Sequence, residues 1–238
     1  MRILEGKAVT KAFGGRRAVD NVDFFVNEGE ILGLIGPNGA GKTTLFNLIS
    51  GAIKLDSGLI TYKDRQISGK KPYEICHMGL ARTFQKAKNF PGMTVWENVH
   101  MGAVFGKQRI SEAEASAETD KVIRFVGLEE QADKSLQDIT LAFQKRVEVA
   151  RALATRPSLL MLDEMMAGLN PTEVSEAMDL VARIRATGVT IVMIEHVMKA
   201  IMSMCDRIVV LHHGQKIAEG LPEEISASPV VIEVYLGE

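Results

Sequence analysis

A glycine-rich segment in the first fifth of the chain carries residue types that bind phosphate groups. Gly36–Thr44 reads GPNGAGKTT and fits the pattern G-x-x-x-x-G-K-[ST]. The glycines let backbone N–H groups approach phosphates, Lys42 can reach the β- and γ-phosphates of a nucleoside triphosphate, and Thr43 is a candidate Mg²⁺ ligand. A plain turn between a strand and a helix is the alternative, but it would not need Lys and Thr at these positions. The predicted nucleotide-binding residues of this segment are Gly36, Pro37, Asn38, Gly39, Ala40, Gly41, Lys42, Thr43 and Thr44.

Two adjacent carboxylates follow an apolar run in the second half of the chain. Ser158–Glu164 reads SLLMLDE, which predicts a buried strand that delivers Asp163 and Glu164 to the crevice beyond its carboxyl end. We expect Asp163 to hold Mg²⁺ through water, and Glu164 to orient or deprotonate the water that attacks the γ-phosphate. A solvated acid pair at a strand end is the alternative. The two motifs together predict a nucleoside triphosphatase without indicating which kind.

The segments that must position these residues alternate between strand and helix patterns. A buried strand leads directly into the glycine-rich segment, and a helix-like TTLFNLIS follows it. Alternating residues near the N-terminus and the stretch LITYKDRQI predict a small antiparallel sheet, and the pattern turns helical from about Glu112 to Thr155. The main core segments are expected at Ile31–Ile35, Ser158–Leu162 and Val189–Ile194 as strands and at Pro171–Ala186 as a helix.

The bulk composition excludes several functional classes. The 238 residues are 46% hydrophobic, and Lys+Arg 28 against Asp+Glu 30 give a net charge of -2, so broad attraction to nucleic acid is not expected. Cys76 and Cys205 lie far apart, which indicates incidental thiols rather than a disulfide framework. No apolar run approaches the roughly 20 residues that span a bilayer, and no secretory signal is recognisable, so we expect a cytosolic chain. Any membrane role must then come from a partner.

Three further motifs indicate the kind of triphosphatase. Gln85 in ARTFQ, the AGLNP segment after the acidic pair, and His196 in IVMIEH resemble, in order and spacing, the Q-loop, D-loop and H-loop of ABC ATPases. The resemblance covers essentially the whole chain and is most specific in RTFQKAKNFPGMTVWENV, EVARALATRPSLLMLDE, AGLNPTE and VIEVYLGE. These segments look like the ATPases of branched-chain (hydrophobic) amino acid importers. ATPases of amide or urea importers and of lipopolysaccharide exporters share many of these sequence features and remain alternatives.

The resemblance implies a fold and further site residues. It implies an α/β P-loop NTPase (RecA-like) core with an N-terminal antiparallel β subdomain, in one domain over 1–238 with a helical subdomain inserted at about 87–154. ATP and Mg²⁺ are the implied cofactors. Gln85 would ligate Mg²⁺ and link the attacking water to the membrane partner, and His196 would contact the γ-phosphate. Phe13 would stack on adenine, although a core Phe is the alternative.

One motif departs from the family pattern. The signature LSGGQ corresponds to Ile139–Phe143, where Thr140 can still donate to a γ-phosphate. The Cβ of Ala142 should hinder the close backbone approach that glycine allows, Phe143 removes an amide, and Met165 stands where the family commonly has proline. ABC ATPases pair head to tail, each site combining the phosphate loop of one subunit with the signature of the other. We therefore expect a second, non-identical ATPase subunit as partner.

The resemblance also implies a location and other partners, and competing classes fit less well. Permease subunits would hold the chain at the cytoplasmic face of the inner membrane, and an external solute-binding protein would act indirectly. A DNA-repair ATPase needs a coiled-coil insertion for which the chain has no room, and a guanine-reading NKxD segment is absent. A regulatory module without hydrolysis is opposed by intact Lys42, Asp163, Glu164 and His196. The apolar residues around Trp96 are either a docking groove for the permease or ordinary subdomain core.

Overall fold

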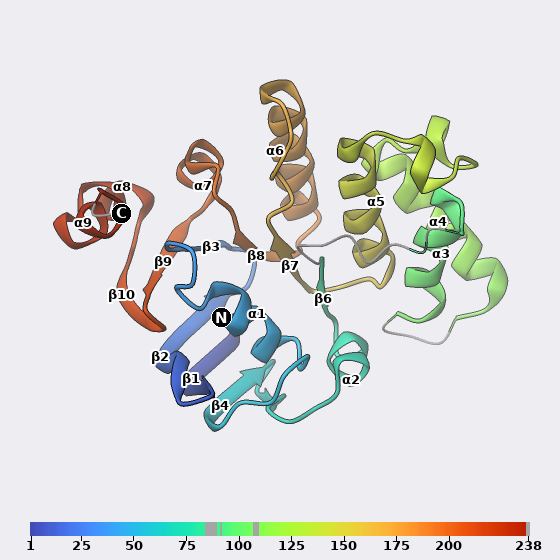
Figure 1. Cartoon of the computed structure of the whole chain (residues 1–238). Coiled ribbons are helices and arrows are strands. Elements are labelled where there is room, and N and C mark those ends of the chain that lie inside the picture. Colours follow the sequence, from blue (N-terminus) through green and yellow to red (C-terminus); the bar gives the residue numbers. More distant parts are fainter. Residues whose placement is uncertain (84–89, 91, 107–109, 237–238) are drawn as a thin grey trace. The chain divides into compact units, whose positions relative to one another are not determined.

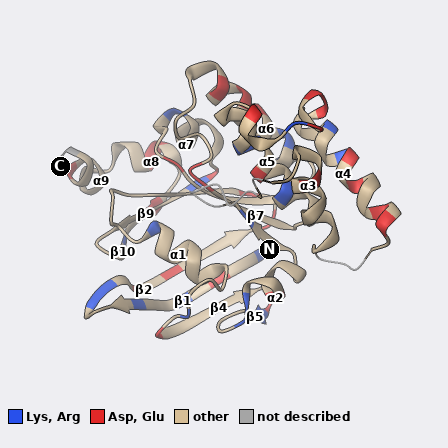
Figure 2. Cartoon of the chain, turned by 45° about the vertical axis from the view of Figure 1, so that its right-hand side comes forward, with Lys and Arg blue, Asp and Glu red and all other residues tan. Residues whose placement is uncertain are grey.

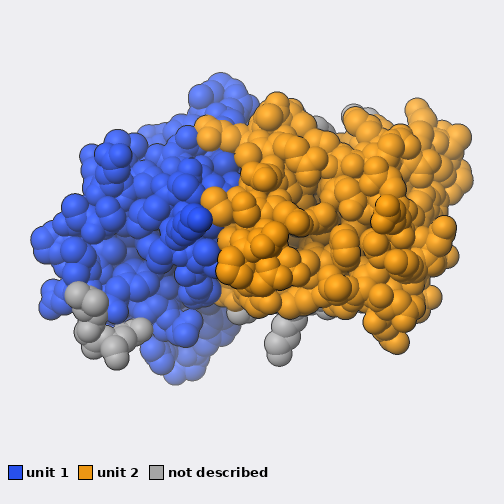
Figure 3. Space-filling model, turned by 90° about the horizontal axis from the view of Figure 1, so that it is seen from above, with its two compact units in different colours: residues 1–75, 190–238 blue, residues 76–189 orange. Residues whose placement is uncertain are grey.

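The computed structural model describes residues 1–83, 90, 92–106 and 110–236 (Figure 1). The chain forms two compact units, coloured separately in Figure 3. Unit 1 contains Met1–Ile75 and Thr190–Glu238, and unit 2 contains Cys76–Val189. The expected single domain with a helical insertion at about 87–154 stays a prediction.

An antiparallel sheet forms the first layer of unit 1. The strand order is β2-β1-β4-β5, and every pairing is antiparallel. Alternate residues of β2 are buried, as its apolar and polar alternation predicts. The predicted antiparallel β subdomain is therefore confirmed. Its strands are β1 (Arg2–Phe13), β2 (Arg16–Asn27), β4 (Ser57–Tyr62) and β5 (Arg65–Gln66).

A second group of strands in unit 1 is mainly parallel. Its order is β10-β9-β3-β8, and β3 pairs in parallel with both β8 and β9. All residues of β3 and β8 are buried, which explains their unbroken apolar sequences. The strands are β3 (Ile31–Ile35), β8 (Thr190–Ile194), β9 (Arg207–His212) and β10 (Gln215–Gly220). The helices nearby in sequence are α1 (Lys42–Ile49), α2 (Pro72–His77), α7 (Met198–Met204), α8 (Pro222–Ala227) and α9 (Pro229–Leu236).

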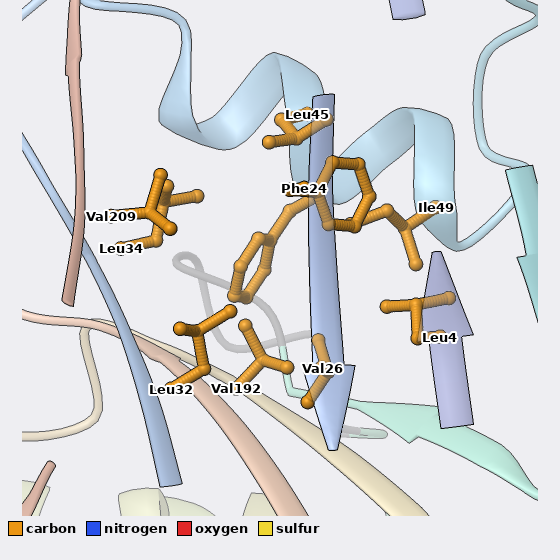
Figure 4. A pocket seen from close by; sticks show the side chains of 10 residues that line it. Leu4, Phe24, Val26, Leu32, Leu34, Leu45, Ile49, Val192 and Val209 are labelled. Carbon is orange, nitrogen blue, oxygen red and sulfur yellow. The ribbon is translucent and has the colours of Figure 1, made fainter. Parts of the chain in front are cut away.

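The core of unit 1 joins its two groups of strands to α1. Figure 4 shows Phe24 of β2 between Leu45 of α1 and Leu32 of β3. A Cβ added to Gly6 on β1 would lie 2.1 Å from the Phe24 ring, so the adjacent strand needs glycine there. This packing fixes the helix that follows the phosphate-binding segment. The full lining is Leu4, Phe24, Val26, Leu32, Leu34, Leu45, Phe46, Ile49, Val192 and Val209.

Unit 2 combines two parallel strands with helices. In β6 and β7, Leu80 lies opposite Leu159 and Arg82 opposite Met161. The strands are β6 (Leu80–Arg82) and β7 (Leu159–Asp163); the helices are α3 (Val95–Val104), α4 (Glu112–Val126), α5 (Leu141–Ala154) and α6 (Pro171–Ala186), with short 3₁₀ turns at Glu129–Gln131 and Leu136–Asp138.

Local capping sets where several helices of unit 2 begin. The side chains of Thr94, Ser111 and Asn170 cap α3, α4 and α6, and each forms a capping box with a Glu three residues later. Figure 2 marks acidic residues along α4, and two of them, Glu112 and Glu114, lie in its first turn, where the helix dipole favours negative charge. The predicted bounds of α6 are confirmed. Among the described residues, no helix has the length and apolar character that crossing a membrane requires.

Candidate functional site

The glycine-rich loop connects the buried strand β3 to helix α1, and its backbone conformation requires glycine at two positions. Gly36 has φ 145°, and an added Cβ would lie 2.0 Å from the carbonyl oxygen of Leu211. Gly41 has φ 106°, and its Cβ would lie 2.3 Å from the carbonyl oxygen of Ala18. Gly39 also has positive φ, at 78°, but open space around it. The loop therefore packs closely at both ends and is open at its tip.

Lys42 lies at the start of α1 and is buried. Its Nζ donates hydrogen bonds to the carbonyl oxygens of Gly36 and, at 2.9 Å, Pro37. The ammonium is thus held against the loop. Gly41 at the N-cap has no side chain to accept from the first backbone N–H groups, so these groups and the positive end of the helix dipole suit an anion.

The turn after β9 supports the glycine-rich loop. This contact was not predicted from the sequence. The backbone N–H of Gly214 donates to the carbonyl oxygen of Ala40 at 3.0 Å, and the carbonyl of Gly214 accepts from Asp20 at 2.8 Å. His213 beside it has φ 46°. The sequence HHG predicts a turn, but not its contact with a segment more than 170 residues earlier, because that contact depends on the order of the strands in the sheet.

His196 follows β8 and is exposed, after the buried Glu195. Strands β8 and β3 are parallel neighbours, with Met193 opposite Gly33. Since parallel strands end at the same edge, His196 and the glycine-rich loop leave the sheet on the same side. Unit 1 therefore brings two of the predicted phosphate-contacting motifs to one edge.

In unit 2, Asp163 is held between the ends of β6 and β7. Its carboxylate Oδ2 lies 3.0 Å from Nη2 of Arg82, and its backbone N–H donates to Oγ1 of Thr83 at 3.0 Å. Thr83 in turn donates its backbone N–H to the carbonyl of Met161 at 2.9 Å. Arg82 and Thr83 begin the motif RTFQ, but their partnership with Asp163 was not predicted.

The surroundings of Asp163 act on its charge in opposite directions. Burial raises its pKa, the nearby Arg82 guanidinium lowers it, and the negative charge of Glu164 raises it. The second carboxylate oxygen, Oδ1, is buried and has no hydrogen-bond partner among the described residues. A buried carboxylate oxygen without a partner is costly unless a cation or water completes its interactions.

Glu164, directly after β7, has an unusual backbone. It is half-buried and has φ 52°, in the left-handed region that residues other than glycine rarely adopt. Its carbonyl oxygen accepts hydrogen bonds from Nζ of Lys145 at 2.8 Å and from the backbone N–H of Ala167 at 3.3 Å. This contact of Lys145 was not predicted from the sequence. The two predicted acidic residues of unit 2 are thus fixed by different neighbours.

The altered signature segment forms the start of helix α5. Thr140 is exposed and caps the helix, its Oγ1 accepting from the backbone N–H of Phe143 at 3.5 Å. Ala142 therefore lies in the first helical turn. Leu141 is 47% exposed, and its Cδ2 lies 3.1 Å from the position of a Cβ on Gly168 in the AGLNP segment. The signature segment and the predicted D-loop are therefore in contact within unit 2.

Two remaining predictions have different outcomes, and a third lies outside the described residues. Phe13 is 52% exposed, so the alternative of a core Phe is wrong, whereas stacking on adenine stays a prediction. Trp96 stacks on His100 with ring centroids 4.5 Å apart and donates to Asp120 at 2.8 Å, so it takes part in packing within the helical region. Gln85 lies outside the described residues.

Comparison with known proteins identifies the class that these features define. A phosphate-binding loop between strand and helix, with a strand-end acidic pair, characterises P-loop nucleoside triphosphatases. Residues 19–167 match the family model described as "ABC transporter", and residues 215–238 match the model "Branched-chain amino acid ATP-binding cassette transporter". The chain belongs to the ABC transporter family. It is the ATP-binding, ATP-hydrolysing subunit of such a transporter.

Relatives and solved structures agree over nearly the whole chain. It is 40% identical to a high-affinity branched-chain amino acid transport ATP-binding protein, BraF, of Pseudomonas aeruginosa, covering 99% of this chain and 98% of BraF. It is 42% identical to LivG of Salmonella typhimurium, covering 95% and 94%.

Among solved structures, a nucleotide-free ATP-binding cassette superposes with a TM-score of 0.91 at 32% identity and full coverage of both chains. A cassette in its ADP conformation gives 0.91 at 33% identity, also with full coverage. A dimeric bacterial cassette gives 0.84 at 26% identity, covering 92% of this chain and 99% of that one. The predicted fold class is thereby confirmed, and nucleotide binding is supported.

Proposed function

We propose that this subunit hydrolyses ATP to drive the import of branched-chain amino acids. The observation that carries the choice of solute is the match of residues 215–238 to the branched-chain amino acid cassette model, because this segment lies beyond the general cassette match. The near full-length similarity to BraF and LivG supports the same choice.

In this proposal each motif has a distinct part in phosphoryl transfer. Lys42 and the N–H groups of the loop bind the phosphates, and His196 contacts the γ-phosphate. Glu164 orients or deprotonates the attacking water. A metaphosphate-like transition state requires mainly positioning and charge stabilisation from the protein. Phe13 is exposed and can stack on adenine, and Gln85 is proposed to link the water to the membrane partner.

The residues around Asp163 fit a magnesium ion. Mg²⁺ in nucleotide sites is bound by one or two protein oxygens together with phosphates and waters, not by a cage of side chains. The described residues contain no cluster of three or more His, Cys, Asp or Glu that could hold a metal. Thr43 and Gln85 are proposed ligands, and Asp163 would hold the ion through water, with Oδ1 available because it has no hydrogen-bond partner among the described residues. When bound, the ion would neutralise developing charge on the phosphates.

The proposal includes a second ATPase subunit that is not identical to this chain. Thr140 is exposed at the N-terminus of α5 and suits a contact with the partner's nucleotide. Ala142 and Phe143 are in the first helical turn, where side chains replace the glycine and the amide of the usual signature. A partner with an intact signature would complete the site that contains Lys42 and Glu164.

Permease subunits would hold the pair at the cytoplasmic face of the membrane, and an external binding protein would deliver the solute. The test is ATP turnover of the chain assembled with its permease subunits, binding protein and ATPase partner in liposomes. We expect external leucine, isoleucine or valine to stimulate turnover and to be taken up, with urea and short amides as controls. Stimulation by urea or an amide alone would overturn the choice of solute, as would transport of lipopolysaccharide outward.

A further inference from the structure

Helix α5 and the segment after β7 are connected by a side chain with no assigned role. Nζ of Lys145 lies 2.8 Å from the carbonyl oxygen of Glu164. Lys145 is on α5, in the second turn from the cap Thr140, so it links the exposed start of this helix to the peptide group of the acidic residue. An ammonium donor makes this a charge-assisted hydrogen bond, which is stronger than one between neutral groups.

The backbone of Glu164 needs such support. Its φ of 52° is in the left-handed region, which costs free energy for a residue with a Cβ and persists only when neighbouring contacts hold it. The other donor to the same carbonyl, the N–H of Ala167, is longer at 3.3 Å and belongs to the same turn. Lys145, by contrast, donates from a different element, helix α5.

A second contact joins the same two segments. Leu141, the first residue of α5, lies over Gly168, where an added Cβ would be 3.1 Å from Cδ2 of Leu141. The two segments also share a small pocket, lined by Ala142 and Lys145 of α5 and by Met165 and Leu169 after β7. These contacts connect the start of α5 to Glu164, through Lys145, and to the Gly168 turn, through Leu141.

We propose that Lys145 is a positioning residue that sets the orientation of Glu164 and couples it to the start of α5. The inference rests on the proposed function. In a head-to-tail dimer, Thr140 would contact the nucleotide at one site, while Glu164 of the same chain acts at the other. Lys145 then transmits the position of α5 at one ATP site to Glu164, which orients the attacking water at the second site.

The test compares Lys145→Met with Lys145→Arg in the assembled transporter. Loss of a residue that orients a functional group lowers activity by about 10- to 100-fold, so we expect Lys145→Met to lower kcat by about this factor. KM and ATP affinity, measured by equilibrium binding without turnover, should change by less than about 2-fold. Lys145→Arg keeps a cationic donor and should restore most of kcat. Lys134→Met is the matched control, because Lys134 is exposed and its Nζ bonds the nearby Gln131.

A second measurement separates positioning from a general effect of charge or folding. In a Glu164→Gln background, followed under single-turnover conditions over hours, Lys145→Met should reduce the residual rate by less than about 2-fold, since it acts through Glu164. An equally large loss in that background would overturn the proposal, as would wild-type kcat in Lys145→Met. A wild-type complex without ATP turnover would instead contradict the proposed function itself.

Discussion

Arg82 and Asp163 form a buried ion pair across the carboxyl ends of β6 and β7. Nη2 and Oδ2 are 3.0 Å apart, and the two side chains are 7% and 0% exposed. Nε of Arg82 also donates to the carbonyl of Thr83 at 3.0 Å, so the guanidinium is fixed by backbone as well as by charge. The proposed magnesium ligand is thus held in place by the residue that ends the neighbouring strand.

Removing one partner of this pair should strongly destabilise the protein. Arg82→Met leaves Asp163 buried without its cation, and breaking a buried pair costs about 3–5 kcal/mol. Denaturant unfolding of the nucleotide-free chain measures this change. Combining Arg82→Met with Asp163→Leu should recover part of the loss, because no buried charge is then left uncompensated. A loss below about 1 kcal/mol in Arg82→Met would contradict the importance of the pair.

The glycine-rich loop should tolerate alanine at its tip better than at its start. Gly39→Ala has open space and should cost about 1–2 kcal/mol for its left-handed backbone. Gly36→Ala adds a clash with the Leu211 carbonyl, so its loss in unfolding free energy should exceed that of Gly39→Ala by about 1–3 kcal/mol. Equal losses would show that the contact with Leu211 does not constrain the loop.

The buried thiol of Cys205 should make stability depend on alkaline pH. Burial, with a smaller effect of Asp206, raises its pKa from 9.0 to about 12. Between these values the unfolded state releases the proton and the folded state keeps it, so stability falls as pH rises from about 9 toward 12. At pH 10.5 this difference in pKa lowers the free energy of unfolding by about 2 kcal/mol. The test compares the free energies of unfolding of wild type and Cys205→Ala at pH 8 and 10.5. An equal change with pH in both proteins would contradict the effect of the thiol.

The altered signature should make this chain a poor ATPase by itself. Without an intact signature from another chain, we expect turnover of the isolated protein to be less than about one tenth of that in the complete complex, because the donors at the γ-phosphate are incomplete. Ala142→Gly with Phe143→Gln should raise the rate of the isolated chain. Full activity of the unmodified chain alone would show that residues 140–143 need no help from a second subunit.

The sequence predicted elements whose signals are local. The buried strands β3 and β7 follow from unbroken apolar runs. Helix α6 begins and ends as predicted, because Pro171 suits its first turn and Gly188 lies just beyond its end. Contacts between distant segments could not be predicted this way. Arg82 meets Asp163 across 81 positions, and Lys145 contacts a backbone oxygen, which carries no sequence signal.

The most direct test of the account is ATP turnover by Glu164→Gln in the assembled transporter. Its amide cannot take a proton from water, so kcat should fall by at least about 100-fold. ATP affinity should stay within about 2-fold of wild type, because the phosphate-binding loop is unchanged, and an ATP-bound dimer should accumulate. Wild-type turnover in this variant would remove Glu164 from the mechanism and contradict the account of catalysis given for this chain.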